Sequence, residues 1–494
     1  MRAAIPATGR DHKAILEEMS GMSSQDADWK SGRTWSMVYY AGKAHHDFLK
    51  RAHNLYFAEN ALNPMAFQSL KRMEAEVVQM TATMLHGPET AVGTMTSGGT
   101  ESILMAVKAA RDRARAKKPW IRTPNIVAPK TIHVAFDKAA HYFGLKVRYV
   151  AVDKDFRADI KALKKAITRN TVLIAASAPQ YPHGVVDPIE EIATIAEKKK
   201  IPFHVDGCFG GFMLPWLEAN GCAIPTWDFR IPGVTSISAD VHKYGYAAKG
   251  ASTVIYRDMS YLKHQFFVST DWPGGIYASP SMPGTRPGGT IAAAWAALQT
   301  MGEDGYRKLA KQAWNASCKL REGVEKIHGL KALGPHHSTV VTWGADEDGE
   351  NEIDIYAVAD VMESKGWSID RQQNPASVHC TVNANQLKVV SNYLSDLEEA
   401  VETVRNNPEL NREGTAPMYG LMAKVPIRGL VKSSVVKVME DMYGPSGGVP
   451  DLSKLGAGQD DGMILEFIHK YGDHFLDAMD YLKKLRRSIF GGGR

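Results

Sequence analysis

Short apolar segments alternate with amphipathic helices through the middle of the chain, and this alternation limits the possible folds more than any other feature. Each apolar segment is roughly four to eight residues long and is followed by turn residues, as expected for buried strands. Strands that are apolar along their whole length are buried on both faces, as in a parallel sheet covered by helices. The sequence therefore predicts an α/β fold with a mainly parallel sheet. The expected strands lie within 125–130, 146–152, 170–179, 201–207, 234–240 and 252–258, and the expected helices include 69–85, 100–116 and 187–200.

The 494 residues are enough for more than one structural unit. Residues 1–60 are polar with aromatic clusters and are expected to form an N-terminal arm, whereas 61–310 should form the large domain. The chain then changes character, and 311–494 are expected to form a smaller C-terminal α/β domain. Its expected elements are strands within 338–346, 366–372 and 377–383, one long helix over 383–405, and a glycine-rich loop over 447–462.

Charge and cysteine content exclude several classes of protein. Lys and Arg number 59 and Asp and Glu 54, a net charge of +5 without a long basic run, so a nucleic-acid partner is not expected. The four cysteines are scattered without metal-ligand spacing, so no metal is expected. No segment has the roughly 20 apolar residues of a membrane span, and the N-terminus lacks the apolar core of a signal peptide. We expect a cytoplasmic enzyme with no transmembrane segment.

Two lysines, Lys243 and Lys249, lie in the small-residue segment SADVHKYGYAAKG that follows an expected strand. Surface lysines would need no special explanation, but near a buried strand an ammonium group is costly. Partial burial lowers the pKa of a lysine and makes its amine a nucleophile toward aldehydes, with which it forms a Schiff base. We therefore consider this segment the first candidate for covalent chemistry.

The segment TSGGTES at 96–102 ends a loop and opens a helix. The backbone N–H groups of Gly98, Gly99 and Thr100 would point at an anion at the helix N-terminus, which suits a phosphate group. A glycine turn that simply starts a helix has the same pattern, so the two interpretations remain open at this point.

Two further polar residues stand where expected strands end. Asp206 follows a buried strand and precedes glycines, where a carboxylate could pair with a protonated ring nitrogen or cap the next helix. His133 stands between a strand and a helix, where an imidazole could stack on a cofactor ring or cap the helix. Taken together with the glycine segment and the lysine segment, these residues describe a pyridoxal phosphate site.

From about residue 31 to about 310 the chain resembles the sphingosine-1-phosphate lyase family, which belongs to the group II decarboxylase relatives among fold-type I pyridoxal phosphate enzymes. The shared stretches include NPMAFQSLKRMEAEVV, TSGGTESILMAVKAARD, IPFHVDGCFGGF and GVTSISADVHKYGYAAKGAS. The run from SADVHKYG through DWPGGIYASP to TRPGG is the part most specific to this family. GTAPMYG, in the C-terminal third, is also similar to a segment of the family.

The resemblance implies a role for each cofactor residue. Lys243 corresponds to the lysine that forms the Schiff base, Asp206 to the partner of the pyridine nitrogen, and His133 to the stacking histidine. The residues that it implies around the cofactor phosphate are Gly98, Gly99, Thr100 and His242, together with Thr285 from the second subunit of a homodimer.

The resemblance also implies substrate residues. Tyr39, Asn60 and Lys249 correspond to positions around the substrate phosphate, and Tyr181 to a position beside the reacting carbons. Tyr39 and Tyr181 could carry protons, or could be buried phenols that only pack and donate hydrogen bonds. Residue 63 is Asn, where we expect His in many relatives.

The implied reaction is a retro-aldol cleavage of a phosphorylated long-chain base into a fatty aldehyde and phosphoethanolamine, as in a sphinganine-1-phosphate aldolase. One alternative is a glutamate or aromatic amino-acid decarboxylase with the same cofactor. Another is an inactive scaffold or lipid-binding protein that keeps the fold, but Lys243, Asp206 and His133 together argue against it.

Overall fold

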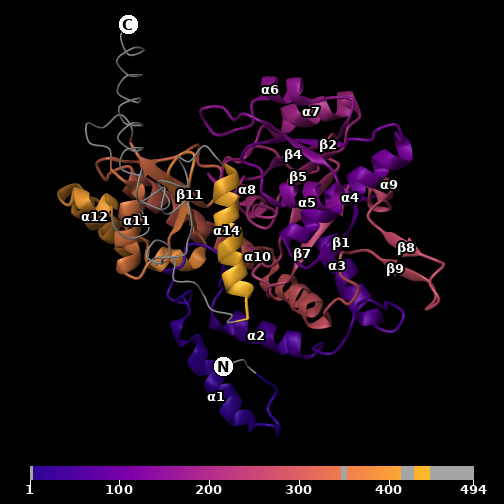
Figure 1. Ribbon diagram of the computed structural model, residues 1–494, viewed down its shortest axis with the longest axis horizontal. Coiled ribbons are helices and arrows are strands. Elements are labelled where there is room, and N and C mark those ends of the chain that lie inside the picture. The colour runs from indigo at the N-terminus through magenta and orange to yellow at the C-terminus, as the bar shows by residue number, and fades with distance from the viewer. Residues whose placement is uncertain (1–3, 347–352, 413–427, 446–494) are drawn as a thin grey trace. The chain divides into compact units, whose positions relative to one another are not determined.

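The computed structural model describes residues 4–346, 353–412 and 428–445 (Figure 1). The chain divides into two compact units, which are described separately. One unit comprises Ala27–Ile353 and Met362–Val401, and the other comprises Met1–Asp26, Asp354–Val361 and Glu402–Arg494.

The larger unit contains a seven-stranded sheet in the order β1-β7-β6-β5-β4-β2-β3. Neighbouring strands from β6 to β3 are parallel, whereas β7 is antiparallel to both β6 and β1. The predicted mainly parallel sheet is confirmed. Its strands are β1 (Val92–Thr96), β2 (Asn125–Pro129), β3 (Lys146–Val150), β4 (Thr171–Ser177), β5 (Phe203–Asp206), β6 (Ser236–Ala239) and β7 (Ser252–Tyr256).

Helices cover both faces of this sheet because its central strands are apolar on both sides. In β2, Ile126 and Ala128 pack into a cluster with residues of α4 and α5, whereas Val127 packs into a second cluster with residues of α3 and α7. The strands β2, β4, β5, β6 and β7 are buried along their whole length. The helices of this part are α2 (Lys43–Asn54), α3 (Gln68–Met84), α4 (Gly99–Lys117), α5 (Ala135–Phe143), α6 (Ile160–Ala166), α7 (Ile189–Lys199), α8 (Leu214–Ala219), α9 (Met259–Leu262) and α10 (Gly288–Val324).

Three features of this part were not predicted. Strand β1 has the sequence VGTMT, in which a glycine and two threonines hide the apolar signal, and it leads directly into the TSGGTES segment. A two-stranded hairpin, β8 (Phe267–Ser269) and β9 (Tyr277–Ser279), precedes the TRPGG segment (Figure 1). Helix α10 is kinked at Gly302, which has a positive φ of 59° that other residues rarely adopt.

A second, antiparallel sheet has the order β10-β11-β13-β12. The predicted strands of the C-terminal part are confirmed as β11, β12 and β13. Helix α10 spans the predicted boundary at residue 310, and the predicted domain limits stay predictions. The predicted helix over 383–405 is wrong in its first turns: Asn383 forms a capping box with Gln386, which starts the short helix η2 instead. The bounds are β10 (Leu330–Ala332), β11 (Val340–Ala345), α11 (Ile355–Ser364), β12 (Asp370–Gln372), β13 (Ser377–Thr381), η2 (Ala384–Lys388) and α12 (Val390–Asn406).

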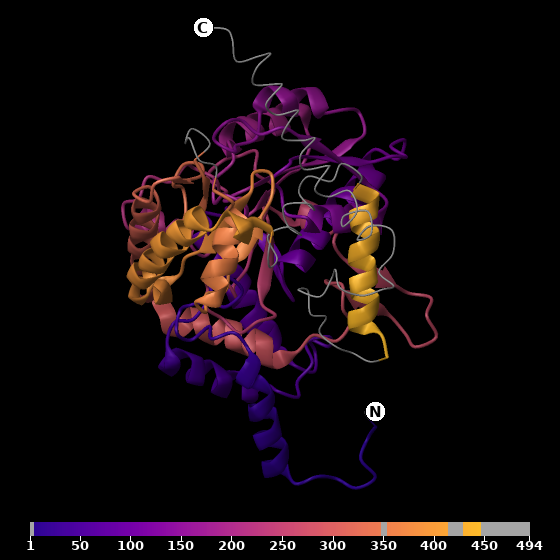
Figure 2. The same ribbon diagram turned by 60° about the vertical axis from the view of Figure 1, so that its left-hand side comes forward.

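The other unit includes α1 (His12–Met22), η1 (Ser23–Gln25), η3 (Pro408–Arg412) and α14 (Arg428–Tyr443), which Figure 2 shows from a second direction. The segments 414–420 and 447–462, discussed above, lie outside the described residues. Among the helices that are described, none combines the length and the apolarity that crossing a bilayer requires.

Candidate active site

A cavity of about 290 Å³ lies beside the segment that follows β6. Its walls come from the arm before α2, the loop after β4, the segments after β5 and β6, and the second sheet, all within the larger unit. Two lysines and one carboxylate therefore face a common space. The lining residues are Ser36, Met37, Tyr39, Tyr181, Phe209, Lys243, Lys249, Asp370 and Thr381.

Lys243 forms an ion pair with a buried carboxylate from its own turn. Its Nζ lies 3.0 Å from Oδ2 of Asp240, whose side chain is almost completely buried. Burial is the largest single influence and would lower the pKa of Lys243, but the charge and hydrogen bond of Asp240, together with the nearby Cys208 and Asp206, outweigh it and raise the pKa above its usual value. The predicted lowering of this pKa is therefore wrong, because the sequence interpretation did not include Asp240.

His242 connects this turn to the glycine segment. Its Nδ1 accepts a hydrogen bond from Ala251 N at 3.1 Å, and its Nε2 lies 3.6 Å from Oδ2 of Asp240. Burial lowers the pKa of His242 to about 4, so the imidazole is neutral at pH 7. A methyl group added at Gly98 would lie 3.4 Å from Cε1 of His242, so the glycine segment passes over the imidazole.

The glycine segment is packed closely against the turns that follow β5 and β6. A methyl group added at Gly99 would lie 2.8 Å from both Sγ of Cys208 and Oδ2 of Asp240, which excludes any side chain there. The Glu101 side chain fixes the glycine segment by hydrogen bonds. Its Oε2 accepts from Ser97 N and Oγ, and its Oε1 accepts from Met282 N. The segment stands at the N-terminus of α4, where backbone N–H groups can bind an anion, and the phosphate role of Gly98, Gly99 and Thr100 stays a prediction.

Asp206 ends β5 and is buried. Its Oδ1 accepts from Cys208 N at 3.1 Å and from Ser238 Oγ at 3.2 Å, and Ser238 in turn contacts Nε2 of His204. Burial lowers the pKa of His204 to about 4, which leaves this imidazole neutral. A fixed carboxylate at a strand end is what a protonated pyridine nitrogen needs.

Lys249 and Tyr39 form a cationic part of the cavity. The Nζ of Lys249 donates to the carbonyl of Met37 and lies 5.1 Å from the centre of the Tyr39 ring. Desolvation by the surrounding protein, followed by the charge of Lys243, lowers the pKa of Lys249 to about 8, although the side chain keeps contact with solvent. Burial also raises the pKa of the Tyr39 phenol, which therefore stays protonated.

Tyr181 lies in the loop after β4 and meets the second sheet. Its Oη donates to Oδ2 of Asp370 at 3.3 Å, and its ring stacks on His379 at 4.1 Å. Neither Asp370 nor His379 was predicted, because a single Asp or His in a strand sequence carries no signal of this contact. Asp240 and Glu101 were missed as well, although their proximity to Lys243 and Gly99 in the sequence could have indicated them.

Eight of the residues assigned by resemblance do not line this cavity, namely Asn60, Gly98, Gly99, Thr100, His133, Asp206, His242 and Thr285. His133 is exposed, and its Nδ1 accepts from Ala135 N at the start of α5, as in the helix-cap alternative. Asn60 donates to Thr285 Oγ1 at 3.3 Å, so these two residues lie together elsewhere. Thr100 is exposed on the first turn of α4.

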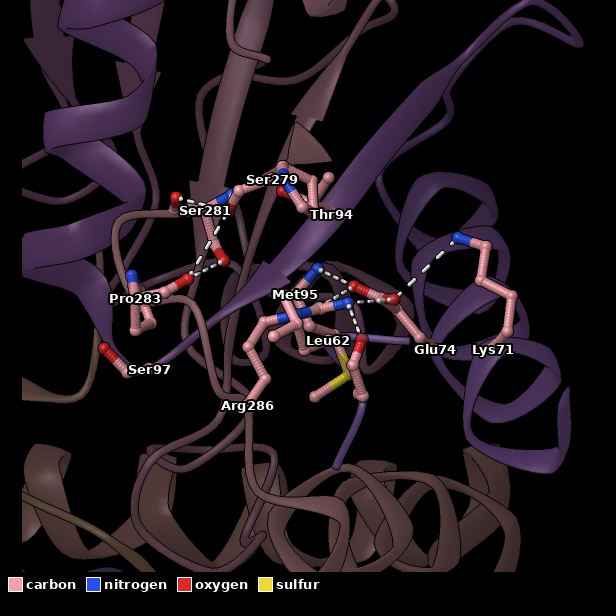
Figure 3. A network of polar contacts seen from close by, with 12 residues as sticks. Leu62, Lys71, Glu74, Thr94, Met95, Ser97, Ser279, Ser281, Pro283 and Arg286 are labelled. Atoms are coloured by element: carbon pink, nitrogen blue, oxygen red, sulfur yellow. Dashed lines mark hydrogen bonds and ion pairs between the residues drawn. The ribbon is translucent and has the colours of Figure 1, made fainter. Parts of the chain in front are cut away.

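The segment 280–287, between β9 and α10, carries Thr285 and is called the strap. It is held by the ion pair of Arg286 with Glu74 (Figure 3). Nη1 of Arg286 lies 2.6 Å from Oε1 of Glu74, whose side chain is 4% exposed, and the same oxygen accepts from Met95 N in β1. Nη2 of Arg286 also donates to the carbonyl of Ala61. The strap is thereby fixed to the strand that leads into the glycine segment.

Asn63 has a local structural role. Its Oδ1 accepts from Met65 N and Ala66 N, which closes the turn before α3. Within the described ranges no group of three or more His, Cys, Asp or Glu side chains is arranged to hold a metal ion.

Comparison with known proteins gives consistent matches over most of the chain. Residues 44–342 match the pyridoxal-dependent decarboxylase conserved domain. A sphingosine-1-phosphate lyase from Arabidopsis thaliana is 45% identical over 87% of this chain and 79% of its own length. One from Saccharomyces cerevisiae is 35% identical over 92% of this chain and 76% of its own length.

Solved structures agree with the fold. A sphingosine-1-phosphate lyase from Burkholderia pseudomallei superposes with a TM-score of 0.81 at 37% identity, covering 90% of this chain and 97% of the other. A glutamate decarboxylase from Lactobacillus brevis superposes with a TM-score of 0.71 at 21% identity, covering 81% and 95%, and shows the shared fold alone. The predicted fold-type I architecture is confirmed.

Proposed function

The chain belongs to the sphingosine-1-phosphate lyase family of pyridoxal-dependent enzymes, and we propose that it cleaves phosphorylated sphingoid bases into a fatty aldehyde and phosphoethanolamine. The observation that carries this proposal is that two lysines, Lys243 and Lys249, line the same cavity. The Lys243 amine would bind the cofactor aldehyde, and the Lys249 ammonium would bind the phosphate of the substrate.

Pyridoxal 5′-phosphate is the cofactor of this family, and the residues present fit it. When bound, it supplies an electron-withdrawing ring that stabilises the negative charge left on the substrate when a bond at Cα breaks. Gly98, Gly99 and His242 would hold its phosphate, and Asp206 would hold the proton on its ring nitrogen. Oδ2 of Asp240 lies 3.0 Å from the Lys243 ammonium, whereas the buried Oδ1 has no hydrogen-bond partner among the described residues, so this carboxylate can accept a further hydrogen bond in the site.

Lys249 and Tyr39 line the part of the cavity where the substrate phosphate would bind. An ammonium group and a protonated phenol can both donate hydrogen bonds to a phosphate oxygen. The remaining charged group of the cavity, Asp370, would repel a phosphate, so charge alone orients the substrate with its phosphate toward Lys249.

The alternative of an amino-acid decarboxylase has less support. Its substrate would bring an α-carboxylate instead of a phosphate, and the decarboxylases among the solved structures are 15–21% identical, which indicates only the fold. The lyase relatives, in contrast, are 35–45% identical over most of the chain.

Purified protein with pyridoxal phosphate, incubated separately with phosphorylated sphingoid base, glutamate and an aromatic amino acid, tests the function directly. We expect fatty aldehyde and phosphoethanolamine from the first substrate and no carbon dioxide from the other two. Carbon dioxide release without aldehyde would replace the proposal by the decarboxylase alternative.

A homodimer with a shared site is part of the proposal. Thr285 and Asn60 are hydrogen-bonded to each other outside the cavity lining, and Leu55, Phe57 and Met65 near them in the sequence are exposed apolar residues. A second subunit that covers this surface would receive Thr285 and Asn60 beside its own Lys243. Sedimentation should show a dimer, and mixing inactive Lys243→Ala with inactive Asn60→Ala chains should restore part of the activity.

The predicted cytoplasmic location also stays a proposal, supported by the four free cysteines.

A further inference from the structure

The second sheet contributes a carboxylate to the cavity that the proposed function has not yet used in the reaction. Asp370 begins β12 and lines the cavity together with Tyr181. The Tyr181 phenol donates to Oδ2 of Asp370 at 3.3 Å, and in the described part of the chain no Lys, Arg or His lies within ion-pair distance of Asp370. The phenol is therefore the polar partner of this carboxylate.

Neighbouring aromatic groups hold the ring of Tyr181 in place. His379 stacks on it at 4.1 Å with an interplanar angle of 24°, and Phe209 meets its edge at 6.0 Å. The Nε2 of His379 is 2.7 Å from Thr381 Oγ1, and its Nδ1 is 3.5 Å from the carbonyl of Pro182. Burial lowers the pKa of His379 to about 4, so this neutral imidazole has both nitrogens occupied and is not a proton acceptor for the substrate.

The direction of the Tyr181 hydrogen bond determines what the phenol can do. Because its proton points at Asp370, its oxygen lone pairs are available to a donor in the cavity. The substrate phosphate is drawn to Lys249, so the group that approaches Tyr181 lies on the other side of the amine-bearing carbon. In the proposed substrate that group is the C3 hydroxyl.

We propose that Asp370 is a positioning residue that makes Tyr181 the proton acceptor for the C3 hydroxyl of the substrate, an inference that rests on the proposed function. The hydroxyl proton moves to Oη of Tyr181 while the phenol proton moves to Oδ2 of Asp370. The electron pair of the broken O–H bond forms the second C–O bond of the aldehyde, and the pair of the broken Cα–Cβ bond stays on Cα. The reverse transfer, from Asp370 through Tyr181 to Cα, returns one proton, so substrate atoms balance and both side chains recover their initial states.

The relay explains how a buried phenol can serve as a base near neutral pH. Burial and then the charge of Asp370 raise the pKa of Tyr181 above its usual value, so a free phenolate is not populated. A concerted transfer to the carboxylate does not require a phenolate. The titratable groups that face Tyr181 are Asp370, His379, Lys243, Cys380 and Tyr39.

Substitution of Asp370 tests the relay through a double-mutant cycle. Asp370→Asn should lower kcat by about 100-fold with little change in KM, in the range usual for general-base catalysis. Tyr181→Phe should have a similar effect, and the double variant should be no worse than the more impaired single variant, because both changes interrupt one pathway. Asp370→Glu should retain more activity than Asp370→Asn.

A matched control is available on the surface. Tyr149 donates to Asp137 outside the cavity, so Asp137→Asn removes a phenol–carboxylate contact without touching the site, and its kcat should equal that of the unmodified protein. Melting temperatures of all variants report whether they fold.

A second readout does not depend on catalysis. In cofactor-free protein with ¹³C-labelled tyrosine rings, the Tyr181 resonance is assigned with Tyr181→Phe. Asp370→Asn should shift this resonance at neutral pH, because it removes the carboxylate that accepts the phenol hydrogen bond; an unchanged chemical shift would contradict the contact.

The outcomes separate the two proposals. If the unmodified protein releases aldehyde and Asp370→Asn keeps kcat within about threefold, or if the two substitutions act additively, the role of Asp370 is overturned alone. If the unmodified protein releases no aldehyde from phosphorylated sphingoid base, the proposed function fails, and the role of Asp370 fails with it.

Discussion

Lys243 and Lys249 follow the same strand and face the same cavity, but their surroundings shift their pKa values in opposite directions. Asp240 lies 3.0 Å from Lys243 and raises its pKa, whereas Lys249 has no carboxylate partner in the described part of the chain and a pKa lowered to about 8. The difference shows that burial alone does not decide the chemistry of a lysine. At Lys243 the neighbouring negative charges together reverse the effect of burial on the pKa, whereas at Lys249 burial remains the largest cause of the shift.

The largest effect is expected from removal of the Lys243 amine. Lys243→Ala should abolish both turnover and the visible absorbance of the protein–cofactor adduct, since no other amine takes its place beside Asp240. Borohydride reduction and peptide mapping should label residue 243 in the unmodified protein. Lys161→Ala, an exposed position on α6, is the control and should retain both properties. A coloured, active Lys243→Ala variant would contradict the assignment.

Removal of the Lys249 charge should have a smaller effect and should leave the cofactor in place. Lys249→Ala is expected to keep the adduct absorbance and to lose about 10- to 100-fold in kcat/KM, because a hydrogen bond to a charged group contributes about 1.5–3 kcal/mol. Normal turnover by this variant would exclude a role for Lys249 in phosphate binding.

The pH dependence of kcat/KM in the unmodified protein should report the protonation of Lys249. The ammonium form of Lys249 binds the phosphate and is lost as pH rises through its pKa of about 8, so kcat/KM should fall above that pH. Lys249→Arg keeps its charge at these pH values and should show no such fall. A decline that persists in the Arg variant would have to come from another group.

Removal of the Asp240 charge should reduce the difference between the pKa values of Lys243 and Lys249. Asp240→Asn removes the charge that raises the pKa of Lys243, so a larger fraction of that amine is neutral at pH 7. Addition of pyridoxal phosphate to cofactor-free protein should then form the adduct at least about tenfold faster, because one pKa unit corresponds to a tenfold change in the neutral fraction. The surface variant Asp137→Asn should react at the unchanged rate, and an unchanged rate in Asp240→Asn would show that Asp240 does not control the amine.

Much of the fold and the centre of the site could be predicted from the sequence. The sequence predicts that Asp206 and Lys243 follow parallel strands, and in the structure β5 and β6 are parallel neighbours whose carboxyl ends lie together; the roles of the two residues stay predictions. The same reasoning could not place Asp370, which comes from the second sheet and meets Tyr181 only through tertiary packing. Asn60 and Thr285 could be named from resemblance, but the contact between them needed the structure.

The missed elements have physical reasons as well. Strand β1 contains Gly93 and two threonines, so its burial arises from pairing with β7 instead of from its own apolarity. The helix expected from residue 383 begins as η2 because Asn383 and Gln386 satisfy each other's backbone groups.

Strand β12 is three residues long and stands at the end of the second sheet, where it pairs with β13. A replacement at its first residue, Asp370, would disturb few backbone contacts while altering the charge next to the bound substrate. Peripheral strands of this kind give evolution, or a protein engineer, a place to retune substrate preference without rebuilding the scaffold that carries the cofactor.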